Sequence, residues 1–546
     1  MKKHYILILV GLISITSHSQ CIEEDDATVL LVGDSWAFFM NADGTFDDVL
    51  EHWGHSNQSY FTNAALAVNG ARTEDFLEEA KLNELENQLT SQPTLKAVHL
   101  SVSGNDFLGA WNVDDTPAEL EALSDETFNE VIGLFDFIQS VRPDIRIVFS
   151  GYMYANFAEV IDDAAPFEES HPFYGSWEGM GFPTFEELNN LLNDFSQRIY
   201  DYSLVEENID FVFMPAYMQY IYGQETPLGV DPGGTYAPYF QPLPFGDLSY
   251  PSPKESMRDY GLFRDCFHLS AGGFNAMIDY QFQKLYQKLL MDDAYLLSTI
   301  ESEMGNISAS GIMSSEVKFG NSDAEDIATV LSFNTTTIPD TLIVGANIFL
   351  RRENVIGAVP FETKVLLTMK HGNLGITADI EAEDFTDLGD IQAEACVFGV
   401  SADSSDWIRI DLPESFMPFI ESGDYTQFSI KPIEIADKVI QFSDGSNPEF
   451  APVFNLKFKQ ETAGINEMVM NDFDVVLYPN PANNVLNMRS SNFNYQKIEI
   501  LNIQGQLVYS EQTKAKSVDV SRLETGHYIL QLIGEEGVYT ASFIKD

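Results

Sequence analysis

An apolar run near the start of the chain ends in a glycine, and a serine follows it. Residues 28–32 are Thr-Val-Leu-Leu-Val, and Gly33-Asp34-Ser35-Trp36 comes directly after them. A short continuous apolar run bounded by a glycine turn is typical of a strand buried on both faces, as in parallel sheets. Open α/β sheets place their ligands at the carboxyl ends of such strands. The sequence therefore predicts that Ser35 lies at the ligand-binding edge of an α/β sheet.

Predicted strands and helices alternate over residues 22–297. Further strands are predicted at residues 95–102, 145–149 and 209–213. Apolar residues at helical spacing predict helices between them, and a last helix follows Ser270. The residues on the predicted apolar faces are Phe128, Val131, Phe135, Ile138, Leu188, Leu191, Phe195, Ile199, Tyr202, Phe274, Ile278 and Leu285. This alternation is typical of a three-layer α/β domain with a parallel sheet.

Ser35 needs a base, because a hydroxyl group is a poor nucleophile until a neighbouring imidazole takes its proton. His268 is the best candidate, and Asp265 three residues earlier could bind the other ring nitrogen and stabilise the imidazolium. Cys266 lies between them in the sequence and is an alternative nucleophile. Its other possible role is that of a small buried side chain that fills space in the core. We therefore predict a catalytic triad of Ser35, His268 and Asp265.

Two further signals predict an oxyanion hole. Asn105 follows the predicted strand 95–102 and could aim its amide at a developing negative charge. Gly70 would let a backbone N–H approach the substrate closely. Taken singly, these residues have structural explanations: a serine after a strand is often a helix N-cap, and an asparagine often forms turns.

The four motifs together resemble the SGNH (GDSL) hydrolase superfamily. Ser35 matches the serine of its first block, Gly70 the glycine of the second and Asn105 the asparagine of the third, while Asp265 and His268 match the final pair. Trp36 and Ala37 depart from the fuller pattern of the first block. The resemblance implies a flavodoxin-like fold and an oxyanion hole made by the N–H groups of Ser35 and Gly70 with the Asn105 amide. It also implies hydrolysis of esters without a metal ion or a cofactor.

Charge and the N-terminus indicate where the protein works. The chain of 546 residues has 29 Lys and Arg against 84 Asp and Glu, a net charge of −55, which argues against nucleic acid as a partner. Lys2 and Lys3 precede an apolar stretch that is too short to span a bilayer, so residues 1–19 are predicted to be a signal peptide. A lipid anchor on Cys21 is the alternative. No other segment is predicted to cross a membrane.

The three cysteines, Cys21, Cys266 and Cys396, are too few for a disulfide framework. A bridge between Cys21 and Cys266 is one expectation for them.

Two aromatic segments interrupt the α/β pattern. One runs from about residue 214 to 264 and the other covers residues 171–177. Both are predicted to form loops at the rim of the active site, either binding substrate or packing onto the body of the domain. Tyrosines and phenylalanines in the longer segment are Tyr217, Tyr220, Tyr222, Tyr236, Tyr239 and Phe240.

The second half of the chain changes to alternating β patterns. Residues 310–460 contain runs such as 342–350 and 364–369 separated by Gly, Asn and Asp, which predict a β-sandwich module. Residues 329–340 loosely resemble DNRLRE-type sandwich modules of secreted carbohydrate-active proteins. This resemblance implies carbohydrate binding, and a role as a spacer is the alternative.

Residues 474–546 resemble the C-terminal sorting domain of type IX secretion substrates. The resemblance depends on residues 477–481, 498–505, 518–523 and 526–530. It implies a small β-sandwich that the type IX secretion machinery recognises, and export through the outer membrane to the medium or the cell surface.

Together these patterns predict a secreted serine esterase that removes acetyl groups from an extracellular polysaccharide. Two alternatives remain open. One is a lipase-like or general esterase for longer acyl chains, which the aromatic loops would permit, and the other is a non-catalytic, carbohydrate-binding surface adhesin.

Overall fold

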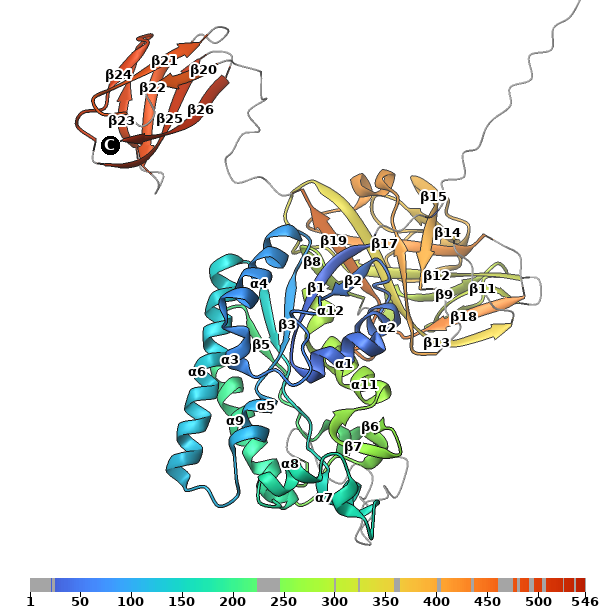
Figure 1. The fold of residues 1–546 in the computed structure, drawn as a ribbon. Coiled ribbons are helices and arrows are strands. Elements are labelled where there is room, and N and C mark those ends of the chain that lie inside the picture. Colours follow the sequence, from blue (N-terminus) through green and yellow to red (C-terminus); the bar gives the residue numbers. More distant parts are fainter. Residues whose placement is uncertain are drawn as a thin grey trace, which may run out of the picture. The chain divides into compact units, whose positions relative to one another are not determined.

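The computed structural model divides the chain into two compact units, residues 1–458 and 459–546 (Figure 1). The structure describes residues 21, 25–222, 246–298, 301–322, 325–357, 364–399, 404–433, 437–459, 475–478, 482–490, 495–502, 507–523, 525–534 and 537–545. The predicted signal peptide lies outside the described residues.

The first unit begins with a five-stranded parallel sheet in the order β2-β1-β3-β4-β5. The strands are β1 (Asp26–Gly33), β2 (Gln58–Phe61), β3 (Ala97–Ser101), β4 (Arg146–Phe149) and β5 (Ile209–Phe211). From the β1–β3 pair, the strands follow in chain order towards both edges of the sheet: β2 lies beyond β1 on one side, and β4 and β5 lie beyond β3 on the other. This pair is therefore the topological switch point, where doubly wound sheets form their binding crevice.

Helices cover both faces of this sheet, as the sequence predicted (Figure 1). Val29 and Leu31 of β1 face one helical layer, and Leu30 and Val32 face the other. The first layer contains α1 (Ser35–Asp43), α2 (Thr45–His52) and α11 (Ala271–Gln281), and the second contains α4 (Glu79–Ser91), α6 (Pro117–Val141) and α9 (Phe185–Ser203). Short helices α3 (Thr73–Phe76), α5 (Gly104–Ala110), α7 (Phe157–Asp162), α8 (Tyr174–Gly179), α10 (Tyr217–Tyr222) and α12 (Gln287–Leu289) complete the layers and loops.

The helix boundaries follow local sequence signals. Thr116 and Glu119 form a capping box at the start of α6, and Thr184 and Glu187 form another at the start of α9. The Ser270 hydroxyl accepts a hydrogen bond from Gly273 N–H and caps α11. These caps fix where the helices that flank the sheet begin.

The middle of the chain forms a closed ring of eight strands rather than the expected β-sandwich. Strand β12 pairs with both β11 and β17, so the order β12-β11-β18-β13-β16-β15-β14-β17 returns to β12. Closure removes the free edges that two separate sheets would expose. The pattern of strands in the sequence does not reveal whether the sheet closes. The ring strands are β11 (Val317–Ser322), β12 (Glu325–Asn334), β13 (Ile343–Gly357), β14 (Lys364–Met369), β15 (Ile391–Phe398), β16 (Trp407–Asp411), β17 (Tyr425–Pro432) and β18 (Lys438–Phe442). Attached to it are β8 (Ala294–Leu297), β9 (Gly305–Ser308), β10 (Met313–Ser314) and β19 (Val453–Phe458).

The α/β part and this barrel share one apolar core. After α2 the chain turns at Gly54, and the Trp53 ring stacks on Trp407 of β16 with 5.3 Å between ring centroids. A Cβ atom at Gly54 would lie 3.4 Å from both Trp407 and Ile408, so a larger residue would crowd the contact. Beside the stack, His52 Nδ1 lies 2.7 Å from Asp406 Oδ1. The two parts therefore pack as one body.

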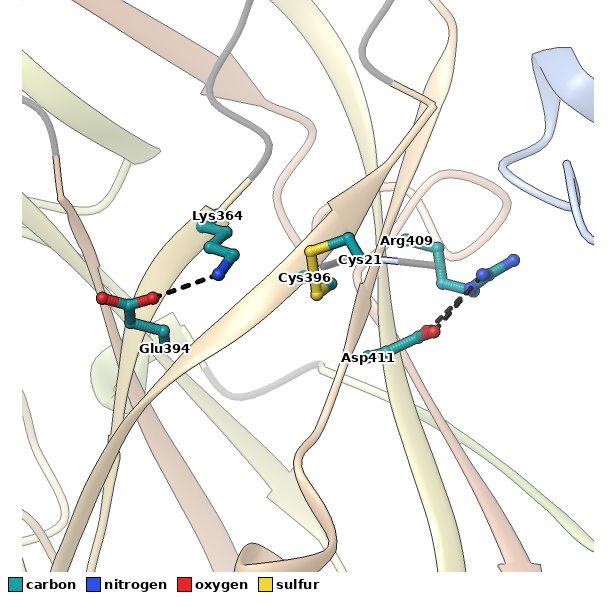
Figure 2. Close-up of a disulfide and its surroundings, with 6 residues drawn as sticks. All are labelled: Cys21, Lys364, Glu394, Cys396, Arg409 and Asp411. Carbon is teal, nitrogen blue, oxygen red and sulfur yellow. Dashed lines mark hydrogen bonds and ion pairs between the residues drawn. A yellow bond between two sulfur atoms is a disulfide. The ribbon is translucent and has the colours of Figure 1, made fainter. Parts of the chain in front are cut away.

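A disulfide joins the start of the chain to the barrel, and it corrects the expected pairing with Cys266. Cys21 is bonded to Cys396 on β15, whereas Cys266 is free and buried. Figure 2 shows the bridge between two ion pairs, Lys364 with Glu394 and the buried Arg409 with Asp411. Because a sulfur in a disulfide cannot form the thioether of a lipid anchor, the bridge argues against the lipoprotein alternative for Cys21.

The second unit consists of two antiparallel sheets. One has the order β20-β21-β24 and the other β23-β22-β25-β26. Leu486 and Val518 from the first share an apolar core with Ile498 and Leu530 from the second. The strands are β20 (Val475–Tyr478), β21 (Val485–Ser490), β22 (Tyr495–Asn502), β23 (Leu507–Glu511), β24 (Ser517–Asp519), β25 (Gly526–Gly534) and β26 (Gly537–Lys545).

Within the described parts of the chain, no helix has the length and apolar content needed to cross a bilayer.

The shared core predicts that the α/β part and the barrel unfold together. Trp407→Ala should destabilise the first unit by about 3–5 kcal/mol, because it removes a buried indole from the contact. Scanning calorimetry should show one transition for this unit, shifted as a whole to lower temperature. Trp177→Ala, away from the junction, is the matched control. A shift confined to one of two separate transitions would contradict the shared core.

The disulfide predicts a loss of stability on reduction. Replacing Cys21 and Cys396 with serine should lower the free energy of unfolding by about 2–4 kcal/mol, because the unfolded chain is no longer cross-linked across 375 residues. Urea unfolding of both proteins measures this difference. Equal stability of the wild-type protein with and without dithiothreitol would show that the bridge does not form.

Candidate active site

Ser35 lies where β1 turns into α1. Gly33 ends the strand so close to β3 that a Cβ atom there would lie 2.0 Å from Ser101 O. Asp34 caps the helix by accepting a hydrogen bond from Trp36 N–H at 3.0 Å. Ser35 is therefore the first residue of α1, at the carboxyl edge of the sheet, where its own N–H group is not used within the helix.

Asn105 comes from the neighbouring strand end. Ser103, between β3 and α5, has φ of 102°, an unfavourable conformation for a residue with a Cβ atom. This turn directs the Asn105 amide towards the start of α1. Its Nδ2 group donates to Ala71 O at 2.8 Å and to Asp34 Oδ2 at 3.5 Å. The longer contact is at the limit for a hydrogen bond, so this N–H is the one available to a substrate.

Gly70 lies in a loop held against the end of β1. Val68 N–H donates to Gly33 O at 2.9 Å, and Gly33 N–H donates to Leu66 O at 2.7 Å. Gly70 has φ of 80°, and no atom lies within 4 Å of the position of a Cβ atom there. The loop is fixed from the other side by Thr73, whose N–H and hydroxyl groups both bond to Asp106.

His268 and Asp265 form the expected pair on β7 (Phe263–Leu269), which makes a hairpin with β6 (Met257–Tyr260). His268 Nδ1 lies 2.7 Å from Asp265 Oδ2, and Asp265 Oδ1 accepts the N–H groups of Phe267 and His268. A carboxylate acceptor requires Nδ1 to carry a proton, which leaves the lone pair on Nε2. Nε2 is buried and has no hydrogen-bond partner among the described residues, Ser35 included.

Contacts with α1 hold this hairpin in place. The His268 ring lies edge-on to Phe39, one helical turn after Ser35, with 4.7 Å between ring centroids. Arg258 of β6 stacks over Phe39 and pairs with Asp43 at the end of α1. His268 therefore packs against the same helix that begins at Ser35. Catalytic hydrogen bonds in free enzymes are often incomplete and tighten when substrate binds.

The buried Asp34 and the partly buried Tyr152 form a hydrogen-bonded pair that the sequence analysis missed. The Tyr152 hydroxyl donates to Asp34 Oδ2 at 2.6 Å. Burial is the main cause that raises the pKa of Asp34 from 3.8 to about 7, and the nearby Asp106 carboxylate adds to it. Gly104 makes room for the Tyr152 ring, because a Cβ atom there would lie 2.9 Å from it. The only signal in the sequence is that Tyr152 follows strand β4 at the same edge of the sheet.

Cys266 and two further histidines, His99 and His171, have structural roles. Burial raises the pKa of the Cys266 thiol, which argues against a thiolate nucleophile. Burial also lowers the pKa of His99 to about 3, and its Nδ1 atom lies 2.8 Å from the Tyr286 hydroxyl. His171 accepts a hydrogen bond from Phe173 N–H and lies 3.1 Å from Arg264 O, so it ties segment 171–177 to β7.

The two aromatic segments differ in where they lie. Phe173 packs on Phe267 with 5.0 Å between ring centroids, and Phe267 packs on His268, so segment 171–177 adjoins the Asp265–His268 pair. Tyr217 is buried and stacks on Tyr280 of α11, which favours a packing role there. Tyr236, Tyr239 and Phe240 lie outside the described residues.

A cavity of about 110 Å³ opens at Ser35. Asn105, Tyr152 and Phe267 also line it, so it adjoins both strand ends and the hairpin that carries His268. In the described parts of the chain, no three His, Cys, Asp or Glu side chains are arranged to hold a metal ion.

Comparison with known proteins identifies the end of the chain. Residues 476–546 match the family described as the secretion system C-terminal sorting domain. This is the type IX sorting domain that the sequence predicted. The protein is therefore exported, and it is secreted or held at the cell surface.

Among solved structures, the chain is similar to three ester hydrolases. A lipase from a goat rumen metagenome is 13% identical, with 48% of this chain and 99% of that one covered and a TM-score of 0.28. A GDSL-like lipase from Bacteroides thetaiotaomicron is 12% identical over 48% and 88%, with a TM-score of 0.27. A family 3 carbohydrate esterase from Clostridium thermocellum is 13% identical over 48% and 98%, with a TM-score of 0.25. Scores this low establish neither fold nor function, and no curated protein matches the chain.

The raised pKa of Asp34 predicts a pH-dependent stability. The folded state binds the proton of the Asp34 carboxyl group more tightly than the unfolded state does. Asp34 therefore contributes its full stabilisation of the folded state below about pH 4, and this contribution is lost as pH rises through about 7. Between those limits the wild-type protein should lose on the order of 4 kcal/mol relative to Asp34→Asn, which cannot ionise. Urea unfolding across this range measures the difference. Asp201→Asn, an exposed aspartate on α9, is the control, and parallel curves for the wild type and Asp34→Asn would contradict the prediction.

Proposed function

We propose that this protein is a serine ester hydrolase of the SGNH type. The observation that carries the proposal is the meeting of three parts at the switch point of the sheet. Ser35 follows β1, Asn105 follows β3, and the Asp265–His268 pair lies against α1 with its Nε2 atom unpartnered among the described residues. The strand order β2-β1-β3-β4-β5, which is that of flavodoxin-like sheets, supports the same assignment.

In this mechanism Ser35 Oγ attacks the ester carbonyl carbon while His268 Nε2 takes the hydroxyl proton. Asp265 holds His268 Nδ1–H and stabilises the imidazolium that forms. The N–H groups of Ser35 and Gly70 and the Asn105 amide bind the oxyanion, and one such donor contributes about 3 kcal/mol to the transition state. The imidazolium protonates the leaving alcohol, and an acyl-enzyme remains.

Water completes the cycle. His268 deprotonates a water molecule that attacks the acyl carbonyl carbon, and the proton returns to Ser35 Oγ as the carboxylic acid leaves. The oxyanion donors act again on the second tetrahedral intermediate. The chemistry requires no metal ion and no organic cofactor.

Two substrate classes follow from the sequence, and both remain predictions. Acetylated extracellular polysaccharide is supported by the export signal. Esters of longer acyl chains are supported by the apolar cavity that opens at Ser35. A purely adhesive protein has no need of a hydrogen-bonded Asp265–His268 pair beside a serine, so the site favours an enzyme.

Variants of the catalytic residues test the proposal with p-nitrophenyl esters. Ser35→Ala and His268→Ala should each lower kcat by about four orders of magnitude or more, and Asp265→Asn by about four, because the imidazole tautomer is lost. Asn105→Ala should cost about 100- to 1000-fold in kcat.

His371→Ala, an exposed histidine of the barrel, is the matched control and should retain wild-type activity. Melting temperatures of all variants confirm that each protein is folded. Hydrolysis that persists in both Ser35→Ala and His268→Ala would rule out the serine mechanism.

A further inference from the structure

The cavity at Ser35 is lined mainly by apolar side chains. Most of its apolar walls come from α5, α9 and the end of β4, and its polar lining residues are Asp34, Ser35, Ser103, Asn105, Tyr152 and Ser196. On α9 the wall residues recur at i, i+3, i+4 and i+7, so a single helix face points into the cavity. The apolar side chains that define the walls are Phe107, Leu108, Leu188, Leu191, Leu192 and Phe195.

We propose that this cavity binds the acyl chain of the substrate and selects straight aliphatic chains of about four to six carbons. The inference rests on the proposed function, because it needs Ser35 as the nucleophile. An apolar cavity of about 150 Å³ in another protein holds a benzene ring, so 110 Å³ has room for slightly fewer carbon atoms beyond the carbonyl group. An acetyl group would leave most of the cavity unfilled.

Burial of the chain supplies the selectivity. Each methylene group moved from water into an apolar site raises kcat/KM by about fourfold. Rates should therefore rise from acetate to butanoate and hexanoate, and fall once the chain is longer than the cavity. Polar acyl groups should react poorly, because no charged side chain other than Asp34 lines the walls to pair with them.

Two phenylalanines close the far side of the cavity. The rings of Phe107 on α5 and Phe195 on α9 meet edge to face with 5.0 Å between centroids. A second cavity of about 240 Å³ lies between α5, α6 and α9, and it shares Phe107, Leu191 and Phe195 with the first. These shared side chains form the wall between the two cavities, and so they set the acyl-chain length.

The test is the profile of kcat/KM for p-nitrophenyl esters from acetate to decanoate, measured with the full chain. The wild-type protein should peak at butanoate or hexanoate, with decanoate at least tenfold lower. Phe107→Ala should join the cavities and raise the decanoate-to-hexanoate ratio at least tenfold. Leu191→Trp should fill the cavity and lower the hexanoate-to-acetate ratio at least tenfold.

Phe137→Ala, which removes a half-buried phenylalanine of the same helical layer outside both cavities, is the control and should leave the ratios unchanged. If Phe107→Ala does not fold, Leu191→Trp alone tests the proposal. A wild-type peak at acetate, or ratios unchanged in Leu191→Trp, would overturn it. Ser35→Ala distinguishes failure of the proposed function from failure of the acyl-cavity proposal. Hydrolysis that persists in Ser35→Ala refutes the serine mechanism. Hydrolysis that depends on Ser35, with a chain-length profile that the cavity variants do not change, refutes only the acyl cavity.

Discussion

The pairing of the ends of β1 and β3 determines the geometry of the candidate site. Gly33 pairs with Ser101, and Asp34 N–H donates to Ser101 O at 2.9 Å. Since no side chain larger than hydrogen fits at Gly33, the two strands can end side by side only with glycine there. Ser35 and Asn105 then leave the sheet at the same edge, at the point where the chain order of the strands reverses.

Two carboxyl groups of the site are buried and are also hydrogen-bonded. Asp265 is 1% exposed, and its oxygens accept three hydrogen bonds, which offset the loss of solvent around a carboxylate. Asp34 is equally buried, and burial raises its pKa to about 7 even though it accepts hydrogen bonds from Tyr152 and Trp36. The two carboxyl groups therefore differ in their partners: Asp265 is hydrogen-bonded to His268, and Asp34 caps the start of α1 and accepts the Tyr152 hydroxyl.

The sequence predicted those parts of the molecule that depend on local patterns. The apolar run at β1, the helical spacing in α6 and α9 and the Asp265–His268 pair are all encoded within short segments. Three features depend on residues far apart in the chain and could not be predicted. They are the pairing of β12 with β17 that closes the barrel, the bond from Cys21 to Cys396, and the hydrogen bond from Tyr152 to Asp34. The wall of Phe107 and Phe195 likewise exists only once α5 packs against α9.

Covalent labelling tests the central claim most directly. A fluorophosphonate probe reacts with a serine only where a neighbouring base and oxyanion donors activate it. Intact mass measurement of the labelled protein should show one adduct, peptide mapping should place it on Ser35, and His268→Ala should not react. An adduct on another residue, or no adduct on folded wild-type protein, would contradict a catalytic Ser35.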